Sequence, residues 1–355
     1  ALFRLLLVAC SRPATAEPTV APTVPPTKPL PTPTPFAPPD VDLSALPVIT
    51  ADNADELRQL DVLRGHEQPV AEVVFNPDGR TLISSAFDGT LRLWDIASGV
   101  EIAAAHHGPQ ATGLAISPDG TTLASAGTDG RLVLYDPETL EEIDLLFDQE
   151  LGLWDVAYSP DGATLALGSV HDTVQLWDME RLEERSVLEG HTDDIMAVDF
   201  GQEGNLLATA SRDKTAIVWD LGTGSAMAVL EGHGAEVRDA ALSPDGGVVA
   251  TCSGLILEEF SIRLWDADTG VQLLALEDQP SAISALAFSI AGDVLVSKGT
   301  EGTIRLWNVE TGSEIAVLPA GPITKFAPGD VAFNPDGTLL VTDGGDGTIR
   351  FWGVY

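Results

Sequence analysis

The sequence predicts an all-β fold built from seven similar units of four short strands each. An aromatic residue followed by a small or polar residue recurs seven times at intervals of 41 to 46 residues, which is the length of one propeller blade. Pro-Asp-Gly turns keep the same phase, and runs such as 303–307 alternate polar and apolar residues as β-strands do. Together these observations predict a seven-bladed β-propeller over residues 57–355. The seven aromatic markers are Trp94, Tyr135, Trp177, Trp219, Trp265, Trp307 and Trp352.

Two further motifs give the repeat a family resemblance. Gly-His pairs end at His66, His191 and His233, and Asp-Gly-Thr-x-Arg-x-Trp segments begin at Asp88 and Asp346. These residues resemble those of the WD40-repeat family over the whole of residues 57–355. The resemblance implies that each repeat supplies the outer strand of one blade and three inner strands of the next. The last repeat ends after its third strand, so we expect residues 59–63 to supply the missing outer strand and close the ring.

The resemblance also implies a structural role for four residues in each complete repeat. In the family a His, a Ser or Thr, an Asp and a Trp form a buried hydrogen-bond network. Such a set looks like a hydrolase triad, but it recurs at the blade period, and one protein does not need several identical catalytic sites. The two complete sets are His66, Ser84, Asp88 and Trp94 in the first repeat and His191, Thr209, Asp213 and Trp219 in the fourth.

The other repeats depart from this pattern. The second has Tyr135 in place of Trp, with His106 or His107 beside Ser125 and Asp129. The third has His171 where the turn Asp belongs. His171 is either a solvated turn residue or a ligand or pH-sensitive group.

The segment before the repeats differs in composition. Residues 1–10 resemble the end of a bacterial lipoprotein signal, because Leu7-Val8-Ala9-Cys10 matches a lipobox whose Cys becomes lipidated. Residues 11–56 are rich in Pro and Thr and are predicted to be a disordered linker. We therefore expect an extracytoplasmic, membrane-anchored protein, at the cell surface or in the periplasm, whose only membrane contact is the N-terminal lipid.

Charge and motif content exclude several classes of function. With 18 Lys and Arg against 54 Asp and Glu, the formal charge is −36, which argues against nucleic-acid binding. The sequence has no G-x-S-x-G, H-E-x-x-H, Walker or EF-hand pattern, and its two cysteines fit neither a disulfide nor a zinc site. No cofactor or metal is expected, although a calcium site made of turn carboxylates stays open.

Loop lengths and residue types select a candidate binding surface. The loops before the first strand of a blade and between its second and third strands share one face. The two long loops, 254–260 and 321–329, both lie there. Exposed aromatic, Met and Arg residues are enriched at interface cores, and two arginines in so acidic a protein suggest an anionic group on the partner. Alternatively, Trp154 and Met196 merely plug the channel mouth. The candidate binding residues are Phe87, Trp154, Met196, Arg212, Arg238, Leu255 and Phe260.

The function most consistent with the sequence is a non-catalytic scaffold for a protein or peptide. It is expected to be a monomeric ring. Two rival classes remain open: an extracytoplasmic hydrolase or lyase that uses channel carboxylates, and the ectodomain of a sensor that acts with a separate signalling chain.

Overall fold

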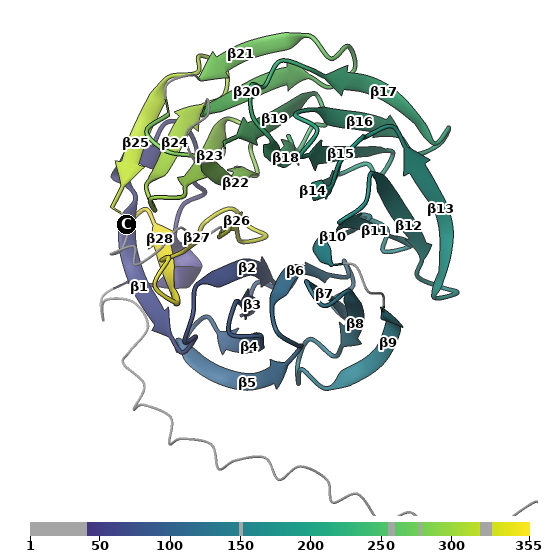
Figure 1. Ribbon diagram of the computed structural model, residues 1–355. Helices are drawn as coiled ribbons and strands as arrows, with labels where there is room; N and C mark the ends of the chain where they lie inside the picture. The colour runs from purple at the N-terminus through teal and green to yellow at the C-terminus, as the bar shows by residue number, and fades with distance from the viewer. Residues whose placement is uncertain (1–40, 149–151, 255–259, 277–278, 320–328) are drawn as a thin grey trace, which may run out of the picture. The chain divides into compact units, whose positions relative to one another are not determined.

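The chain folds into seven four-stranded antiparallel sheets arranged as blades around a central channel (Figure 1). The computed structural model describes residues 41–148, 152–254, 260–276, 279–319 and 329–355. Residues 1–40, with Cys10 and most of the expected linker, lie outside the described residues, as do Leu255 and most of the two long loops. The all-β, seven-bladed architecture predicted from the repeats is therefore confirmed.

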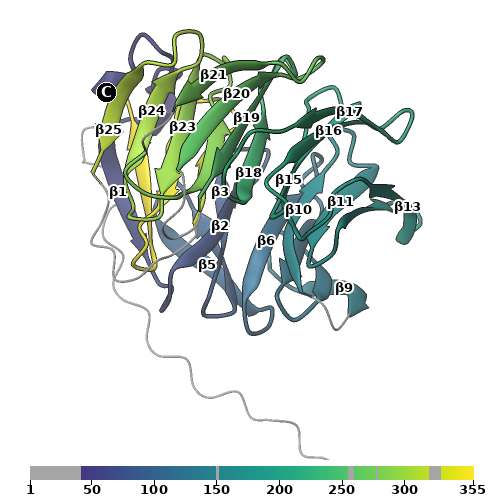
Figure 2. The ribbon, with the colours of Figure 1, turned by 45° about the horizontal axis from the view of Figure 1, so that its top comes forward.

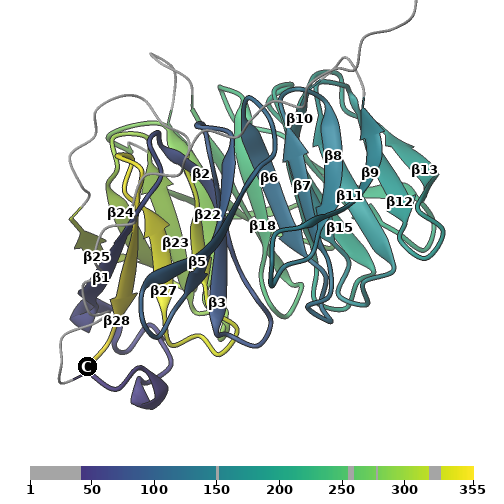
Figure 3. The same ribbon diagram turned by 90° about the horizontal axis from the view of Figure 1, so that it is seen from below.

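Each blade runs from an innermost strand at the channel to an outermost strand at the rim (Figure 1). Figures 2 and 3 show these strands running between the two faces of the ring. Blade 1 contains β2 (Val70–Phe75), β3 (Thr81–Ala86), β4 (Thr90–Asp95) and β5 (Val100–His106); blade 2 contains β6 (Ala111–Ile116), β7 (Leu123–Gly127), β8 (Arg131–Tyr135) and β9 (Glu142–Asp148). Blade 3 contains β10 (Leu153–Tyr158), β11 (Thr164–Ser169), β12 (Thr173–Asp178) and β13 (Glu183–Glu189); blade 4 contains β14 (Ile195–Phe200), β15 (Leu206–Ser211), β16 (Ala216–Asp220) and β17 (Ser225–Leu230).

The remaining blades follow the same plan, except that the two ends of the chain share the last one. Blade 5 contains β18 (Val237–Leu242), β19 (Val248–Ser253), β20 (Ser261–Asp266) and β21 (Gln272–Leu276); blade 6 contains β22 (Ile283–Phe288), β23 (Val294–Gly299), β24 (Ile304–Asn308) and β25 (Glu314–Leu318). Blade 7 contains β26 (Val331–Phe333), β27 (Leu340–Asp343), β28 (Thr348–Gly353) and β1 (Arg58–Arg64).

The N-terminal strand β1 pairs antiparallel with β28, with Leu63 opposite Ile349 and Arg58 opposite Gly353. This pairing is consistent with the ring closure expected from residues 59–63. It covers an edge of β28 that would otherwise be open to pairing with another chain.

Buried apolar residues lie between the blades. Among the described residues, one apolar cluster joins each of the seven pairs of neighbouring blades. Pro-Asp-Gly turns connect first and second strands, and their glycines adopt positive φ, for example 72° at both Gly162 and Gly337. A side chain is strained in that conformation, which explains why Gly ends each of these turns.

The linker predicted for residues 11–56 was wrong for its last part. Residues 41–56 contain two short 3-10 helices, η1 (Leu43–Ala45) and η2 (Ala54–Glu56). Leu46 packs in the cluster between blades 7 and 1, and Ile49 packs in the cluster between blades 6 and 7. The Ile49 N–H also donates to Gly337 O at 2.8 Å. We call residues 41–56 the strap; it lies beside the C-terminus (Figure 3).

Composition misled the prediction because a few apolar residues decide the behaviour of the strap. Pro and Thr dominate residues 11–40, but residues 41–56 contain only one of each, and there Leu46 is 8% exposed and Ile49 is fully buried. Burying a large aliphatic side chain contributes roughly 1.5–3 kcal/mol, which offsets the ordering of the few residues around it.

The strap should stabilise the ring. Ile49→Ala should lower the free energy of unfolding by about 2–5 kcal/mol, because it leaves a cavity between blades 6 and 7. Val48→Ala is the matched control, since Val48 is 41% exposed. Thermal melts of both variants check this, and equal melting temperatures would contradict the packing of the strap.

Candidate functional site

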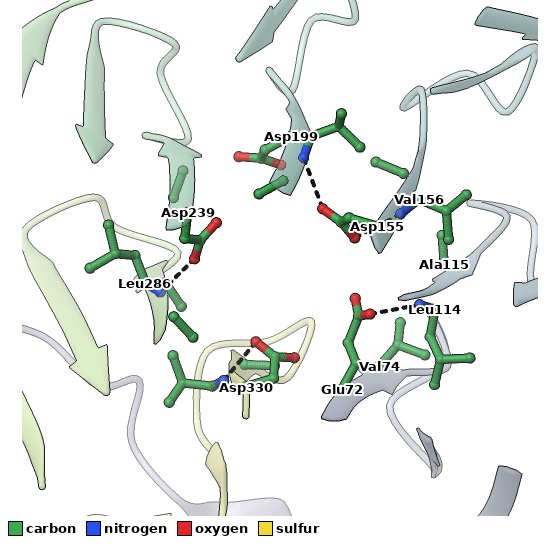
Figure 4. Close-up of a pocket in the computed structure, with 18 of the residues that line it drawn as sticks. Glu72, Val74, Leu114, Ala115, Asp155, Val156, Asp199, Asp239, Leu286 and Asp330 are labelled. Carbon is green, nitrogen blue, oxygen red and sulfur yellow. Dashed lines mark hydrogen bonds between the residues drawn. The ribbon is translucent and has the colours of Figure 1, made fainter. Parts of the chain in front are cut away.

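The innermost strands enclose a channel of about 760 Å³. Five blades each place one carboxylate on its wall: Glu72, Asp155, Asp199, Asp239 and Asp330 (Figure 4). All five are half-buried. The channel is therefore acidic through its middle.

Each of these carboxylates joins two blades. The backbone N–H of Val198 in blade 4 donates to Asp155 Oδ2 at 2.8 Å, and the N–H of Leu286 in blade 6 donates to Asp239 Oδ2 at 2.7 Å. The other three accept in the same way from Leu114 (Glu72, 2.7 Å), Leu242 (Asp199, 2.7 Å) and Val73 (Asp330, 3.2 Å).

The two remaining junctions are bridged by hydroxyl groups. Thr112 Oγ1 donates to Leu153 O at 2.8 Å between blades 2 and 3, and Ser284 Oγ donates to Gly329 O at 3.3 Å between blades 6 and 7. All seven junctions thus carry a hydrogen bond between an inner-strand side chain and the backbone of the next blade. We call these seven hydrogen bonds the channel belt.

The channel wall shifts the titration of its carboxyl groups. Burial raises the pKa of Asp155 to about 8, with added repulsion from Asp239 and Asp330, although two backbone N–H donors oppose it. Burial likewise raises the pKa of Asp330 and of Asp199 to about 7 and that of Asp239 to about 6. The pKa of Glu72 is also raised, by burial and by repulsion from Asp155 and Asp330.

A bulge at the start of the inner strands aims two consecutive side chains into the channel. In β10 the register shifts between Leu153 and Asp155, so that Trp154 and Asp155 both line the channel. The same shift in β14 and β18 places Met196 and Arg238 there.

The structure thus brings four of the proposed binding residues to one channel: Phe87, Trp154, Met196 and Arg238. We call these four residues the mouth. All four are half-buried.

The arginines do not fit the anion-binding role suggested for them. Arg212 bonds Asp194 at 2.6 Å and lies 3.8 Å from Glu236, and Arg238 also pairs with Glu236. Both positive charges are therefore compensated within the chain. Sequence spacing could not reveal this, because the acidic partners lie on loops of blades 4 and 5.

Arg212 also packs against the mouth. Its guanidinium carbon lies 5.2 Å from the centroid of the Trp154 ring, which is cation–π geometry. The arginine of blade 4 thereby holds the indole of blade 3 in place.

The other proposed site residues are not brought to the mouth. Phe260 is half-buried and does not line the channel. Leu255 lies outside the described residues, and so does the lipidation candidate Cys10.

The two complete repeat sets form hydrogen-bond networks inside their blades. In blade 4, Trp219 Nε1 donates to Thr209 Oγ1 at 2.9 Å, and Thr209 Oγ1 lies 2.8 Å from His191 Nε2. The hydroxyl accepts from the indole and donates to Nε2, which leaves His191 Nδ1–H to donate to Asp213 at 2.9 Å. We call this arrangement the clasp.

Blade 1 contains the same clasp. Trp94 Nε1 donates to Ser84 Oγ at 2.9 Å, His66 Nε2 lies 2.7 Å from that oxygen, and His66 Nδ1 lies 3.3 Å from Asp88. Burial raises the pKa of Asp88 and of Asp213, but hydrogen bonds from the histidines and from threonines lower it far more.

Seven consecutive segments of the chain match the family model described as WD domain, G-beta repeat. The matched residues are 57–95, 100–136, 146–178, 182–220, 224–266, 270–308 and 320–353. The chain belongs to the WD-repeat family. WD-repeat propellers are in general protein-interaction scaffolds and not catalysts.

Two relatives share short stretches with this WD-repeat chain. It is 33% identical to Dynein assembly factor with WD repeat domains 1 of Xenopus laevis, over 18% of this chain and 21% of that protein. It is 39% identical to Protein Mut11 of Chlamydomonas reinhardtii, over 17% of this chain and 16% of that protein. The chain spans about a fifth or less of the length of these relatives.

Two further observations concern ligands and membranes. Across the described ranges, no three or more His, Cys, Asp or Glu side chains are arranged to hold a metal ion. In the same part of the chain, no helix has the length and apolar character needed to cross a bilayer.

The alignment of the repeats predicted the mouth residues, but the channel belt was not predicted from the sequence. The available signal was a carboxylate at the inner strand of most repeats, such as Asp155 and Asp239. That pattern does not show which group each carboxylate binds, because the donor is a backbone N–H group in the next repeat.

The clasp of the WD-repeat blade should be structural. His191→Ala should lower the free energy of unfolding by about 1–3 kcal/mol, because Thr209 and Asp213 lose their buried partner. His171→Ala, at an exposed turn position, is the control and should leave stability unchanged. Urea unfolding of both variants measures this, and equal midpoints would remove the structural role.

The channel carboxyls should make stability fall as pH rises. Their pKa values are raised on folding, so the folded state binds more protons than the unfolded state between about pH 4 and pH 8. The free energy of unfolding should therefore decrease across that range. Asp155→Asn keeps an acceptor oxygen without the charge, so its melting temperature should decrease less between pH 5 and pH 8.

Asp78→Asn, on an exposed turn, controls for the general repulsion of an acidic protein. It should retain the pH dependence of the parent. If Asp155→Asn and Asp78→Asn depend on pH equally, the channel is not the source of the effect.

Proposed function

We propose that this WD-repeat propeller is a non-catalytic scaffold that binds a protein or peptide at its mouth. The observation that carries the proposal is that Phe87, Trp154, Met196 and Arg238 line one channel. Trp154, Met196 and Arg238 lie at the starts of β10, β14 and β18, and Phe87 directly follows β3, so all four belong to the same face of the ring. Aromatic, Met and Arg side chains are the types enriched at the cores of protein interfaces.

The fixed position of Trp154 supports this role. Its ring packs under Arg212, which Asp194 in turn holds at 2.6 Å. An indole that is already ordered loses little further conformational entropy when a partner covers it. Large aromatic residues held in this way are frequent binding hot spots.

The charged groups around the mouth indicate which kind of partner could bind there. Because Asp194 and Glu236 already compensate Arg212 and Arg238, an anionic group on the partner has no free positive charge to meet. The proposed partner therefore presents an apolar side chain to Trp154 and Met196, with polar contacts at the surrounding charged groups.

The channel belt favours a scaffold over a hydrolase or lyase. Each channel carboxylate has an oxygen bonded to the backbone of the next blade, as Asp239 has to Leu286. A general acid or base must place an oxygen within hydrogen-bond reach of the substrate and exchange a proton with it. In Asp155, Asp239 and Asp330 the second oxygen also accepts a backbone N–H, from the residue that follows. Groups that hold the ring together are poorly suited to that task.

We propose further that the scaffold is an extracytoplasmic bacterial lipoprotein attached through Cys10. The lipobox-like Leu7-Val8-Ala9-Cys10 and the Pro/Thr-rich composition after it support this location. In the full-length precursor, Cys10→Ser should move the protein from the membrane fraction to the soluble fraction. Unchanged fractionation, or an intact mass without lipid, would reject the anchor.

The mouth is tested first by capturing its partner. A photo-crosslinking amino acid in place of Phe87 should trap a protein or peptide from a membrane extract. The same amino acid in place of Ile290, in the turn between β22 and β23 on the opposite face of the ring, should not trap it.

Trp154→Ala should then weaken binding of the captured partner by about 2 kcal/mol or more, because a buried aromatic anchor is lost. Its melting temperature should stay close to that of the parent, since Trp154 is only half-buried. Ile290→Ala is the matched control on the opposite face and should bind normally. Titration calorimetry measures both, and equal affinities would place the binding site elsewhere.

A further inference from the structure

The blades differ in how much of the clasp they contain. Blades 1 and 4 have the complete network, and blade 5 has a variant in which Thr251 Oγ1 lies 2.7 Å from both His233 Nε2 and Trp265 Nε1. In the part of the chain that the structure describes, blades 6 and 7 keep only the hydrogen bond from Trp to a hydroxyl group. Trp307 Nε1 donates to Ser297 Oγ at 2.8 Å, and Trp352 Nε1 donates to Thr342 Oγ1 at 3.0 Å. Among the described residues of blades 2 and 3, none of the three hydrogen bonds of the clasp is formed.

In blade 2 the clasp residues are present but unconnected. His107, Ser125 and Tyr135 are each at most 2% exposed, and their side-chain polar atoms have no hydrogen-bond partner among the described residues. His107 Nε2 lies 3.8 Å from Asp129. A phenol carries its hydroxyl at the far end of the ring, whereas an indole carries its N–H on the side. Tyr135 therefore does not place a donor where Ser125 can accept it.

Unpartnered buried polar groups weaken the blade that contains them. Each costs about 1–3 kcal/mol relative to a hydrogen-bonded group. Burial also lowers the pKa of His107 to about 4, although Asp129 opposes the shift, so the ring is neutral at physiological pH and forms no ion pair there. Blade 2 thus lacks the hydrogen bonds that the clasps of blades 1 and 4 contain.

Blade 3 lacks the clasp for a different reason. Leu167, which pairs with Gln175, occupies the strand position that Ser84 and Thr209 occupy in their own blades. Blade 3 therefore has no hydroxyl group at this position. Trp177 Nε1 consequently has no acceptor among the described residues. Trp177 instead stacks on Phe147 of blade 2, with ring centroids 5.2 Å apart and planes 18° from parallel.

The two blades that form none of the clasp's hydrogen bonds are therefore neighbours, joined by stacking. An apolar stack has no directional bonds, so it tolerates sliding better than a hydrogen-bond network does. The bridge between them in the channel belt is the uncharged bond from Thr112 to Leu153. Blade 3 also carries Trp154 of the mouth.

We propose that blades 2 and 3 form a deformable sector of the ring, which lets the mouth change its width at Trp154 when a partner enters. Blades 1, 4 and 5, with their clasps, form the rigid part. The change in width at the mouth rests on the proposed function. The difference in rigidity between the blades does not, and it can be measured on the protein without a partner.

Hydrogen exchange of the full chain tests the difference directly. Amides of β7, β8, β11 and β12 should exchange about tenfold faster or more than the equivalent amides of β3, β4, β15 and β16. Equal or slower exchange in blades 2 and 3 would overturn the proposal, whether or not any partner binds.

Two reciprocal substitutions test the cause. Trp219→Tyr reproduces the blade 2 arrangement in blade 4 and should accelerate exchange in β15 and β16 to the rate of β7 and β8. Tyr135→Trp should slow exchange in β7 and β8. If Tyr135→Trp does not fold, Trp219→Tyr alone decides, and unchanged exchange in blade 4 would overturn the role of the clasp.

Movement of the sector is measured with spin labels at matched turn positions. In a Cys10→Ser background, whose remaining Cys252 is buried, one label is attached at Glu301→Cys in blade 6. The second is attached at Asp172→Cys in blade 3 or at the equivalent Lys214→Cys in blade 4. The blade 3 pair should give the broader distance distribution. Equally narrow distributions would show that the sector does not move and would reject the proposal.

Discussion

Seven hydrogen bonds between neighbouring blades, arranged around the channel, are the interaction on which the rest of this ring depends. A propeller has no element that crosses its centre, so every blade is held only by the two beside it. Apolar packing fills each junction, but it is not directional. The channel belt adds a directional contact at the innermost strand of all seven blades, where a small rotation would move the whole blade.

Building that belt from carboxylates has consequences for charge. A carboxylate accepts backbone N–H groups strongly, but five of them on one channel wall repel one another and lose hydration. Their raised pKa values follow directly, as for Asp155 at about 8. The bulge that aims Asp155 at the next blade also aims Trp154 at the opening, so one local irregularity serves both ring closure and the mouth.

The sequence predicted what repeats locally and missed what connects one repeat to another. The blade count and the two clasps follow from motifs at a fixed period, because His191, Thr209 and Trp219 lie in one repeat. The charge compensation of Arg212 by Glu236 crosses from blade 4 to blade 5, and the belt ends on backbone atoms that carry no sequence signal. The strap was missed for a third reason: its residues were grouped with the Pro/Thr-rich residues before them, and the average composition of residues 11–56 hid the buried Ile49.

The role of the channel belt is tested most directly by the free energies of unfolding of two variants at one belt residue, Asp199. Asp199→Asn retains an oxygen that can accept the Leu242 N–H, whereas Asp199→Ala leaves that N–H without a partner. At pH 8 the free energy of unfolding of Asp199→Asn should equal or exceed that of the parent, because the repulsive charge is gone and the hydrogen bond remains. Asp199→Ala should be about 1–3 kcal/mol less stable. Equal stabilities for the two variants would contradict the claim that the channel belt holds the blades together.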